Sequence, residues 1–324
     1  MKGLKKILLL TGIAVCLSGC AERAQEETPV MRNEEADAPQ IGITFDSFVI
    51  ERWQRDRDVF VATVNELGAQ VNVQNANGSV EEQKSQIQYF IDKKVDVIVV
   101  VAVDSSALVE EVEQAHRAGI KVIAYDRLLL YSGADLYISF DNEMVGTLMG
   151  RTIAEQMPEG GKVIKIGGPV KDNNVKLVEQ GFLKEISGKK LDILASFNAS
   201  EWKGEEAFNY LNSHVRELYQ AGAIMCGNDC LASQAIRALS ERRLAGKVIV
   251  VGQDADLDAC QRIVEGTQNM TVYKPIERLA KQAAQCAVAL AEGREPVQEE
   301  GIRLETIEDG MQVIPYVKIA PERV

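Results

Sequence analysis

The residues best suited to chemistry in this 324-residue chain are planar polar groups and tryptophans that stand just after short apolar runs. Side chains of Asp, Asn and Arg can form hydrogen bonds in pairs, and an aromatic ring can cover an apolar face. Both features suit a ligand such as a sugar, which carries neighbouring hydroxyl groups on a ring with a C–H face. The candidate ligand contacts are Arg52, Trp53, Asp126, Arg127, Asn174, Trp202, Asn228, Asp254 and Lys274, with Asp46, Asp172 and Asp229 as further possibilities.

The apolar runs that precede these residues predict the strands that must position them. Helical stretches with apolar residues three and four positions apart separate the runs, a pattern typical of parallel sheets covered by helices on both faces. In such sheets ligands bind beyond the carboxyl ends of the strands, where the candidate residues stand. The expected strands are residues 40–45, 69–74, 95–101, 120–125, 136–140, 162–167, 191–197, 222–226 and 247–252, with a last short strand within 311–319.

So many strand and helix units exceed one sheet of typical size, and we expect an α/β fold of two doubly wound parallel-sheet lobes. Helices beginning near Met144 and Pro275 mark the expected crossings between the lobes. Each lobe is then discontinuous in sequence. The first is expected to comprise residues 40–141 and 275–307, and the second residues 142–274 and 308–324.

The amino terminus reads as a targeting segment. Basic residues precede an apolar run at 7–17, which is about as long as the core of a signal peptide. The run ends in Leu-Ser-Gly-Cys, which looks like a bacterial lipobox with lipidation at Cys20; an ordinary secretory signal is the alternative. We therefore expect a signal peptide at 1–19, and a lipid anchor and solvated tether at 20–39.

The composition argues against nucleic acid and metal as partners. The formal net charge of −12 repels phosphate backbones. The four cysteines after the lipobox (Cys226, Cys230, Cys260 and Cys286) have no zinc-like spacing to the histidines, and their thiol or disulfide state is left open. Acidic residues at 254, 256, 258 and 265 match ligand positions of a calcium-binding EF-hand loop, but Ala259 replaces the glycine of its turn. We expect no metal and no cofactor.

Each candidate contact also has a purely structural interpretation. Asn228 and Asp256 could cap the helices that follow them. Asp126 and Arg127 could form a surface ion pair, and Trp53 could be core packing. These readings stay open site by site, but solvated charges have no reason to gather at one end of the strands.

Several segments resemble those of bacterial D-xylose-binding proteins, which belong to the type I, ribose-binding-like periplasmic family. The resemblance runs from about residue 40 to about residue 296, and the combination of GQDAD with MTVYKPI is its most selective part. The segments that carry it are ERWQRDRD (51–58), AYDR (124–127), YISFDNE (137–143), DNN (172–174), ND (228–229), GQDADL (252–257) and MTVYKPI (270–276).

The resemblance implies two lobes joined by three crossings that close over a pyranose. By this resemblance Trp53 and Trp202 would sandwich the ring, and the charged and amide candidates would bond its hydroxyls. Xylose lacks the hydroxymethyl group of glucose, so a pocket closed tightly by the two tryptophans is expected to exclude hexoses.

The resemblance leaves two partners open. The protein could deliver the sugar to a membrane ABC permease, or signal to the extracellular domain of a histidine kinase in a two-component system. Two departures from the family concern this choice. Residues 128–134 form an apolar loop where the family usually has a polar one, and the chain stops at Val324, whereas the family's usual members continue past the position of Pro315 with a further basic and polar segment. We expect delivery to a permease and keep the sensor as the alternative.

Two other classes of protein are weighed against a binding protein. A glycosidase could use Asp126 and Asp254 as its carboxylate pair, but one of the two would need a raised pKa, and Arg52, Arg127 and Lys274 would keep both ionised. A sugar-responsive repressor would begin with a basic helix-turn-helix. We expect no enzymatic activity.

Overall fold

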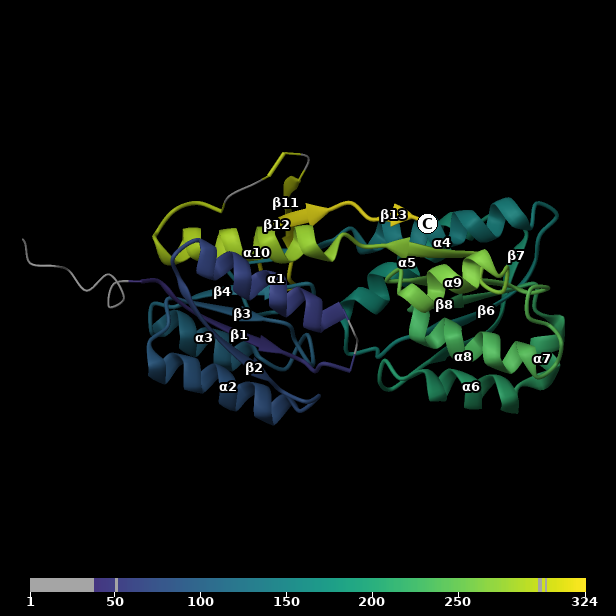
Figure 1. The fold of residues 1–324 in the computed structure, drawn as a ribbon, viewed down its shortest axis with the longest axis horizontal. Coiled ribbons are helices and arrows are strands. Elements are labelled where there is room, and N and C mark those ends of the chain that lie inside the picture. The colour runs from purple at the N-terminus through teal and green to yellow at the C-terminus, as the bar shows by residue number, and fades with distance from the viewer. Residues whose placement is uncertain (1–37, 50–51, 297–298, 301) are drawn as a thin grey trace, which may run out of the picture. The chain divides into compact units, whose positions relative to one another are not determined.

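The computed structural model describes residues 38–49, 52–296, 299–300 and 302–324 (Figure 1). The predicted signal peptide, Cys20 and nearly all of the tether lie outside these residues. The remaining chain folds into two α/β lobes, each built on one sheet. The strands are β1 (Gln40–Phe45), β2 (Gln70–Asn75), β3 (Val97–Val100), β4 (Lys121–Tyr125), β5 (Leu136–Phe140), β6 (Gly161–Gly167), β7 (Leu191–Asn198), β8 (Ala223–Cys226), β9 (Ile249–Gln253), β10 (Met270–Tyr273), β11 (Arg303–Glu308), β12 (Val313–Ile319) and β13 (Glu322–Arg323).

Helices follow most of these strands, as the alternating pattern predicts. The helices are α1 (Arg52–Glu66), α2 (Val80–Lys93), α3 (Val109–Arg117), α4 (Asn142–Gln156), α5 (Asn173–Ile186), α6 (Gly204–Ser213), α7 (Val215–Gln220), α8 (Asp229–Ser240), α9 (Leu257–Val264) and α10 (Ile276–Ala291). The strands expected from the sequence are confirmed to within two residues at their ends, whereas β10, β11 and β13 were not expected.

The first lobe contains a seven-stranded sheet in the order β11-β12-β5-β4-β3-β1-β2. Figure 1 shows α1 and α10 on one face and α2 and α3 on the other. Alternate residues of each strand feed the two faces: Val97 and Val99 pack with α1 and α10, whereas Ile98 and Val100 pack with α2 and α3. This explains why β3 is apolar throughout.

The second lobe contains a six-stranded sheet in the order β13-β10-β9-β8-β6-β7. Helices α4 and α5 pack on one face with Val163 and Val251, and α6 and α8 pack on the other with Ile164 and Val250. The two sheets have the same strand topology. Their strand order reverses between β1 and β3 in the first lobe and between β6 and β8 in the second, which are the topological switch points where ligands bind in such sheets.

The chain passes between the sheets from β5 to α4, from β10 to α10, and from β12 to β13. The last passage lies later than expected. Residues 308–324 were assigned to the second lobe, but β12 pairs in parallel with β5 of the first, with Tyr316 opposite Tyr137. The reason is that β12 supplies buried side chains to both apolar faces of that sheet, Ile314 to one and Val317 to the other.

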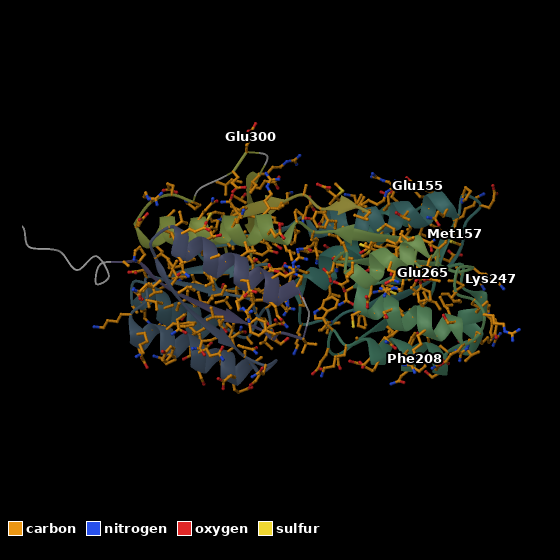
Figure 2. All side chains as sticks on the ribbon, viewed as in Figure 1. Glu155, Met157, Phe208, Lys247, Glu265 and Glu300 are labelled. Carbon is orange, nitrogen blue, oxygen red and sulfur yellow. The ribbon has the colours of Figure 1, made fainter. Side chains whose placement is uncertain are left out.

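Only β13 joins the second sheet, where it pairs antiparallel with β10. Its Arg323 also forms an ion pair at 2.7 Å with Glu155 of α4. Figure 2 labels Glu155 on the outer side of that helix. Short as it is, β13 attaches the end of the chain to the second lobe.

Candidate ligand-binding site

In the first lobe, Arg52 is held by two carboxylates. It is the first residue of α1 and is 6% exposed. Its guanidinium lies 3.3 Å from Asp56, one turn further along the helix, and 2.8 Å from Asp126, which follows β4. It also lies 4.3 Å from the centre of the Trp53 ring. Tyr125 donates a hydrogen bond to Asp56, so the cluster is fixed on several sides.

Arg127 links the two lobes. Its guanidinium lies 2.8 Å from Asp46 of the first lobe and 2.8 Å from Asp172 of the second, and it donates a hydrogen bond to the carbonyl of Ala102. All three charged side chains are buried. Because Asp126 pairs with Arg52 and Arg127 pairs with these two aspartates, the surface ion pair considered from the sequence is wrong.

The second lobe contributes groups from strand ends and helix starts. Asp172 caps α5 by accepting a hydrogen bond from the backbone amide of Asn174. The side-chain amide of Asn174 donates to the Asp126 carboxylate of the first lobe at 3.0 Å. Asp254 follows β9 in a positive-φ conformation and lies 2.6 Å from the ammonium of Lys274.

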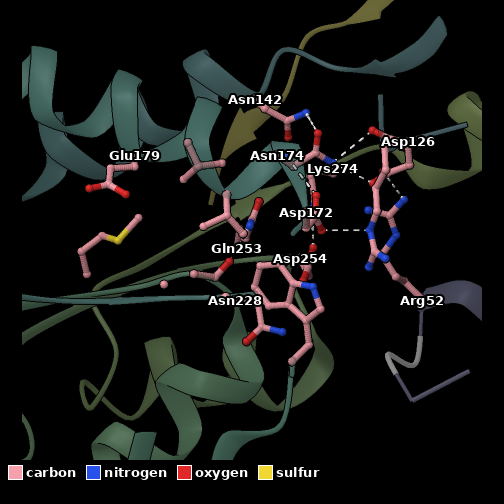
Figure 3. A pocket seen from close by; sticks show the side chains of 18 of the residues that line it. Arg52, Asp126, Asn142, Asp172, Asn174, Glu179, Asn228, Gln253, Asp254 and Lys274 are labelled. Carbon is pink, nitrogen blue, oxygen red and sulfur yellow. Dashed lines mark hydrogen bonds and ion pairs between the residues drawn. The ribbon is translucent and has the colours of Figure 1, made fainter. Parts of the chain in front are cut away.

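These residues line a single cavity between the two lobes (Figure 3). Every residue singled out as a main candidate lines it, and so does Asp172. Asp46 lines an adjoining hollow together with Arg127, Asp172 and Trp202.

Five polar atoms among the lining side chains are buried without a hydrogen-bond partner in the described part of the chain. Two of them, on Arg127 and Asp254, lie within ion pairs. The other three are the indole nitrogens of Trp53 and Trp202 and the side-chain oxygen of Gln253. Buried polar atoms are normally satisfied, so atoms left open beside a cavity indicate that a ligand or water completes them. The residues therefore fit a ligand that both donates and accepts hydrogen bonds, as hydroxyl groups do.

The charges of the site determine how its carboxyl groups ionise. Burial by itself would raise the pKa of Asp126, but the positive charges of Arg52, Lys274 and Arg127 outweigh it and lower that pKa. Asp172 differs, because burial raises its pKa more than Arg127 lowers it. Asp126 is thus held as a carboxylate, an acceptor without a proton to give.

Asp229 does not line this cavity. It is 1% exposed and accepts hydrogen bonds from Gln268 at 2.8 Å and from Thr271 at 2.7 Å. It also accepts from the amide of Asp256. Its role in the structure is to connect α8 to β10 and to the loop after β9.

Two of the purely structural interpretations made from the sequence are correct, yet both residues also line the cavity. Asn228 caps α8 by accepting from the amide of Leu231 at 2.8 Å, and it also lines the cavity. Trp53 is 1% exposed and belongs to the core of the first lobe, while its ring also lines the cavity. A cap or a core residue is therefore no argument against ligand contact here.

The sequence reasoning missed several lining residues. Gln253 ends β9 directly before Asp254, so the strand-end rule could have found it. Asn142 begins α4 at a crossing and donates to Asn174 at 3.0 Å. Lys165, Glu179 and Met225 gave no signal, because they lie inside an apolar strand, on a helix and within another apolar strand.

Several other features concern what the described residues lack. They contain no group of three or more His, Cys, Asp or Glu side chains placed to hold a metal ion. Within the same residues no disulfide bond is present. None of the helices described is both long enough and apolar enough to cross a bilayer.

Two packed lobes with a polar cleft at the switch points of both sheets define a two-lobed ligand-binding protein. A family model described as a periplasmic binding protein domain matches residues 41–295. The chain belongs to this family, in its type I, ribose-binding-like branch.

Two curated relatives support the family, and a solved structure supports the fold. The chain is 38% identical to the D-xylose-binding periplasmic protein of Escherichia coli K12, over 98% of this chain and 92% of that protein. It is 43% identical to the D-xylose-binding periplasmic protein of Haemophilus influenzae, over 78% and 77%. A carbohydrate transporter solute-binding protein from Chloroflexus aurantiacus, solved with D-glucose, matches at a TM-score of 0.80 and 24% identity, covering 89% of this chain and 93% of that one.

Proposed function

We propose that this protein binds D-xylose, or a closely related pentose, in the cavity between its lobes and delivers it to a membrane ABC permease. The observation that carries the proposal is the lining of that cavity. Two tryptophans and a set of buried charged and amide side chains converge there, with open hydrogen-bonding atoms on Trp53, Trp202 and Gln253. The names of the two curated relatives point to the same sugar.

The roles we assign follow from the chemistry of each group. Trp53 and Trp202 cover the apolar faces of the pyranose. Arg52, Arg127 and Lys274 donate to hydroxyl oxygens, Asp126 and Asp254 accept from hydroxyl hydrogens, and the amides of Asn174 and Asn228 can do both.

Closure of the two lobes is the proposed working motion. Arg127 with Asp172, and Asn174 with Asp126, connect opposite sides of the cleft, as expected of a closed form. A sugar that contacts both sides binds the closed form better than an open one. It can shift the balance only by that difference in affinity.

We propose binding without turnover. Asp126 has a lowered pKa, so it is a poor general acid, and Asp172, whose pKa is raised by burial, is held in an ion pair with Arg127. A glycosidase needs one carboxyl group that stays protonated and can donate its proton. Incubating the protein with aryl xylosides and measuring the released phenol tests this. Release above that of a buffer blank would revive the enzyme reading.

Calorimetric titration with xylose, ribose, arabinose, glucose and galactose tests the ligand. We expect xylose to bind most tightly. If glucose bound and xylose did not, the assignment to xylose would be wrong.

We further propose that the protein is extracytoplasmic and attached to the membrane by lipid at Cys20. The lipobox sequence supports this proposal, as does the periplasmic class of the relatives. Mass spectrometry of the protein from bacterial membranes should find a diacylglyceryl cysteine at the amino terminus. A Cys20→Ala variant that stays in the membrane fraction would contradict it.

The alternative role is a sensor that passes its closed state to a histidine kinase. The feature that favours it is the apolar loop at 128–134, whose Tyr131 is 50% exposed beside the turn that carries Met311, which is 60% exposed. Capture of membrane proteins on the xylose-loaded protein distinguishes the roles. Recovery of permease subunits supports delivery, and recovery of a kinase supports sensing.

A further inference from the structure

The cavity continues into the second lobe beyond the residues assigned to the sugar ring. Its lining there includes Lys165, Val178, Glu179 and Met225. Figure 3 shows Glu179 at the end opposite Arg52 and Asp126, with Gln253 between them. None of these inner residues has a role in the binding of a pentose as proposed above.

Lys165 is an unusual residue for its position. It lies in the middle of β6, is 5% exposed, and points to the same face of the sheet as Val163, which packs with Val178 and Met225. A buried ammonium is costly unless it is paired. Its ion-pair partner is Glu179 of α5, whose carboxylate lies 2.5 Å away.

The pair presents both a donor and an acceptor to the cavity. Lysine has three N–H donors, and a carboxylate has several acceptor positions, so one mutual contact leaves capacity on both. A hydroxyl group needs just such a donor and such an acceptor. The pair has no net charge, so neither a ligand carboxylate nor a ligand amine gains a net attraction, and a neutral group suits it. The neighbouring Val178 and Met225 suit the carbon that carries it.

The helix that carries Glu179 is held firmly against α4. A Cβ atom at Gly146 of α4 would overlap the carbonyl of Val178, and one at Gly181 of α5 would overlap the carbonyl of Glu143. The two helices therefore approach closely at their glycines on either side of the pair. The position of Glu179 is therefore set by the packing of α5 on α4.

We propose that this inner end binds the hydroxymethyl group of a hexopyranose, so that the cavity accepts D-glucose as well as D-xylose. D-Glucopyranose is D-xylopyranose with one added hydroxymethyl group, and Lys165 and Glu179 supply the donor and acceptor for its hydroxyl. The inference rests on the proposed function. The expectation that hexoses are excluded considered only the two tryptophans. With Lys165 and Glu179 in the cavity, we expect a hexose to be accepted.

Three ligands isolate the added group: D-xylose, 6-deoxy-D-glucose, which has the carbon without the hydroxyl, and D-glucose. Calorimetry on the purified full chain should show that glucose binds, and that it binds at least about tenfold more tightly than 6-deoxyglucose. In Lys165→Met that ratio should fall to about one. Xylose affinity should change by less than about threefold, because xylose does not reach the pair.

Lys162→Met is the matched control, since Lys162 lies on the same strand but is exposed and bonds Gln220 at the surface. It should leave all three affinities unchanged. Glu179→Gln, which keeps an acceptor oxygen, should lower the glucose preference without removing it.

The proposal is overturned if xylose binds and glucose does not, or if Lys165→Met leaves the ratio of glucose to 6-deoxyglucose affinity unchanged. It is also overturned if Lys165→Met weakens all three sugars equally, because the lysine would then act through general electrostatics. Failure of xylose itself to bind wild-type protein would instead refute the proposed function, and this inference with it.

Discussion

The two lobes present different kinds of surface to the cavity. In the first lobe Arg52 is neutralised within the lobe, between Asp56 and Asp126, and Arg127 pairs with Asp46 as well as with Asp172 of the second lobe. The second-lobe side presents four amide side chains, the indole of Trp202 and the ion pairs Lys274–Asp254 and Lys165–Glu179. Of these residues, Gln253 and Trp202 retain open polar atoms.

This difference separates the residues that stabilise the fold from those that only contact the ligand. The buried ion pairs of the first lobe hold the lobe together as well as facing the ligand, because each would leave a costly unpaired charge if one partner were lost. In the second lobe the amide side chains stand at strand ends and helix starts, outside the apolar clusters of its core. Substitutions in the first lobe should therefore reduce both stability and binding, and those in the second mainly binding.

The largest expected effect is that of Arg52→Ala. It leaves Asp56 and Asp126 buried without their cation, and should lower the free energy of unfolding by about 3 to 5 kcal/mol. Urea denaturation followed by circular dichroism measures this. Arg55→Ala is the control, since Arg55 lies in the same helix but forms an exposed pair with Glu277. If both variants unfolded alike, the stabilising role of the first-lobe cluster would be refuted.

Asp254→Ala tests the second lobe. It leaves Lys274, which is 8% exposed, without the carboxylate at 2.6 Å, and should cost about 2 to 5 kcal/mol of binding free energy. Calorimetry should detect no binding at micromolar xylose, while the loss of stability stays below that of Arg52→Ala. The control is Asp258→Ala, on the exposed side of α9. Wild-type affinity in Asp254→Ala would show that this residue is not a ligand contact.

Replacing the two tryptophans, one from each lobe, should have a smaller effect on binding and compares the lobes directly. Replacing either by Phe removes an indole donor that is open in this structure, which should weaken xylose binding by about 0.5 to 1.5 kcal/mol. Trp53 is a fully buried core residue, so its variant should also lower the melting temperature, whereas the half-buried Trp202 should not. Equal melting temperatures would mean that the distinction between the lobes does not extend to their aromatic residues.

A separate effect, on the pH dependence of stability, concerns Asp229. Burial raises its pKa to about 7, and the nearby charge of Asp254 adds to this, while the hydrogen bond from Thr271 opposes it. The folded state then binds more protons than the unfolded state between about pH 4 and pH 7. The free energy of unfolding should fall as the pH rises through that window, by at most about 1.4 kcal/mol per pH unit, and level off above it.

Asp229→Asn should flatten this slope, as measured by urea denaturation from pH 4 to pH 8. Asp258→Asn, an exposed change, should leave it as in wild type. A slope unaffected by Asp229→Asn would assign the pH dependence to other groups.

The sequence predicted much of this molecule, for identifiable reasons. Parallel strands covered on both faces must be apolar throughout, and a ligand must sit at their carboxyl ends, so the strands and the residues that follow them could be found together. The same rule could have identified Gln253, which ends β9.

The boundary at the carboxyl terminus could not be found in this way. From its sequence a late strand such as β12 could extend either sheet, and the choice depended on where Ile314 and Val317 could be buried. Asp229 likewise follows a strand end directly after Asn228, yet hydrogen bonds with Gln268 and Thr271 draw it away from the cavity.

By itself, then, the sequence determined the two-lobed α/β class and the residues available at the strand ends, because periodicity and the order of elements are local properties. Only the tertiary structure decided the partners of each charge, such as Arg52 with Asp126 and Arg127 with Asp172. It alone brought Lys165 and Glu179 together in the cavity. These contacts join residues of different elements, and their geometry depends on how the packed elements meet.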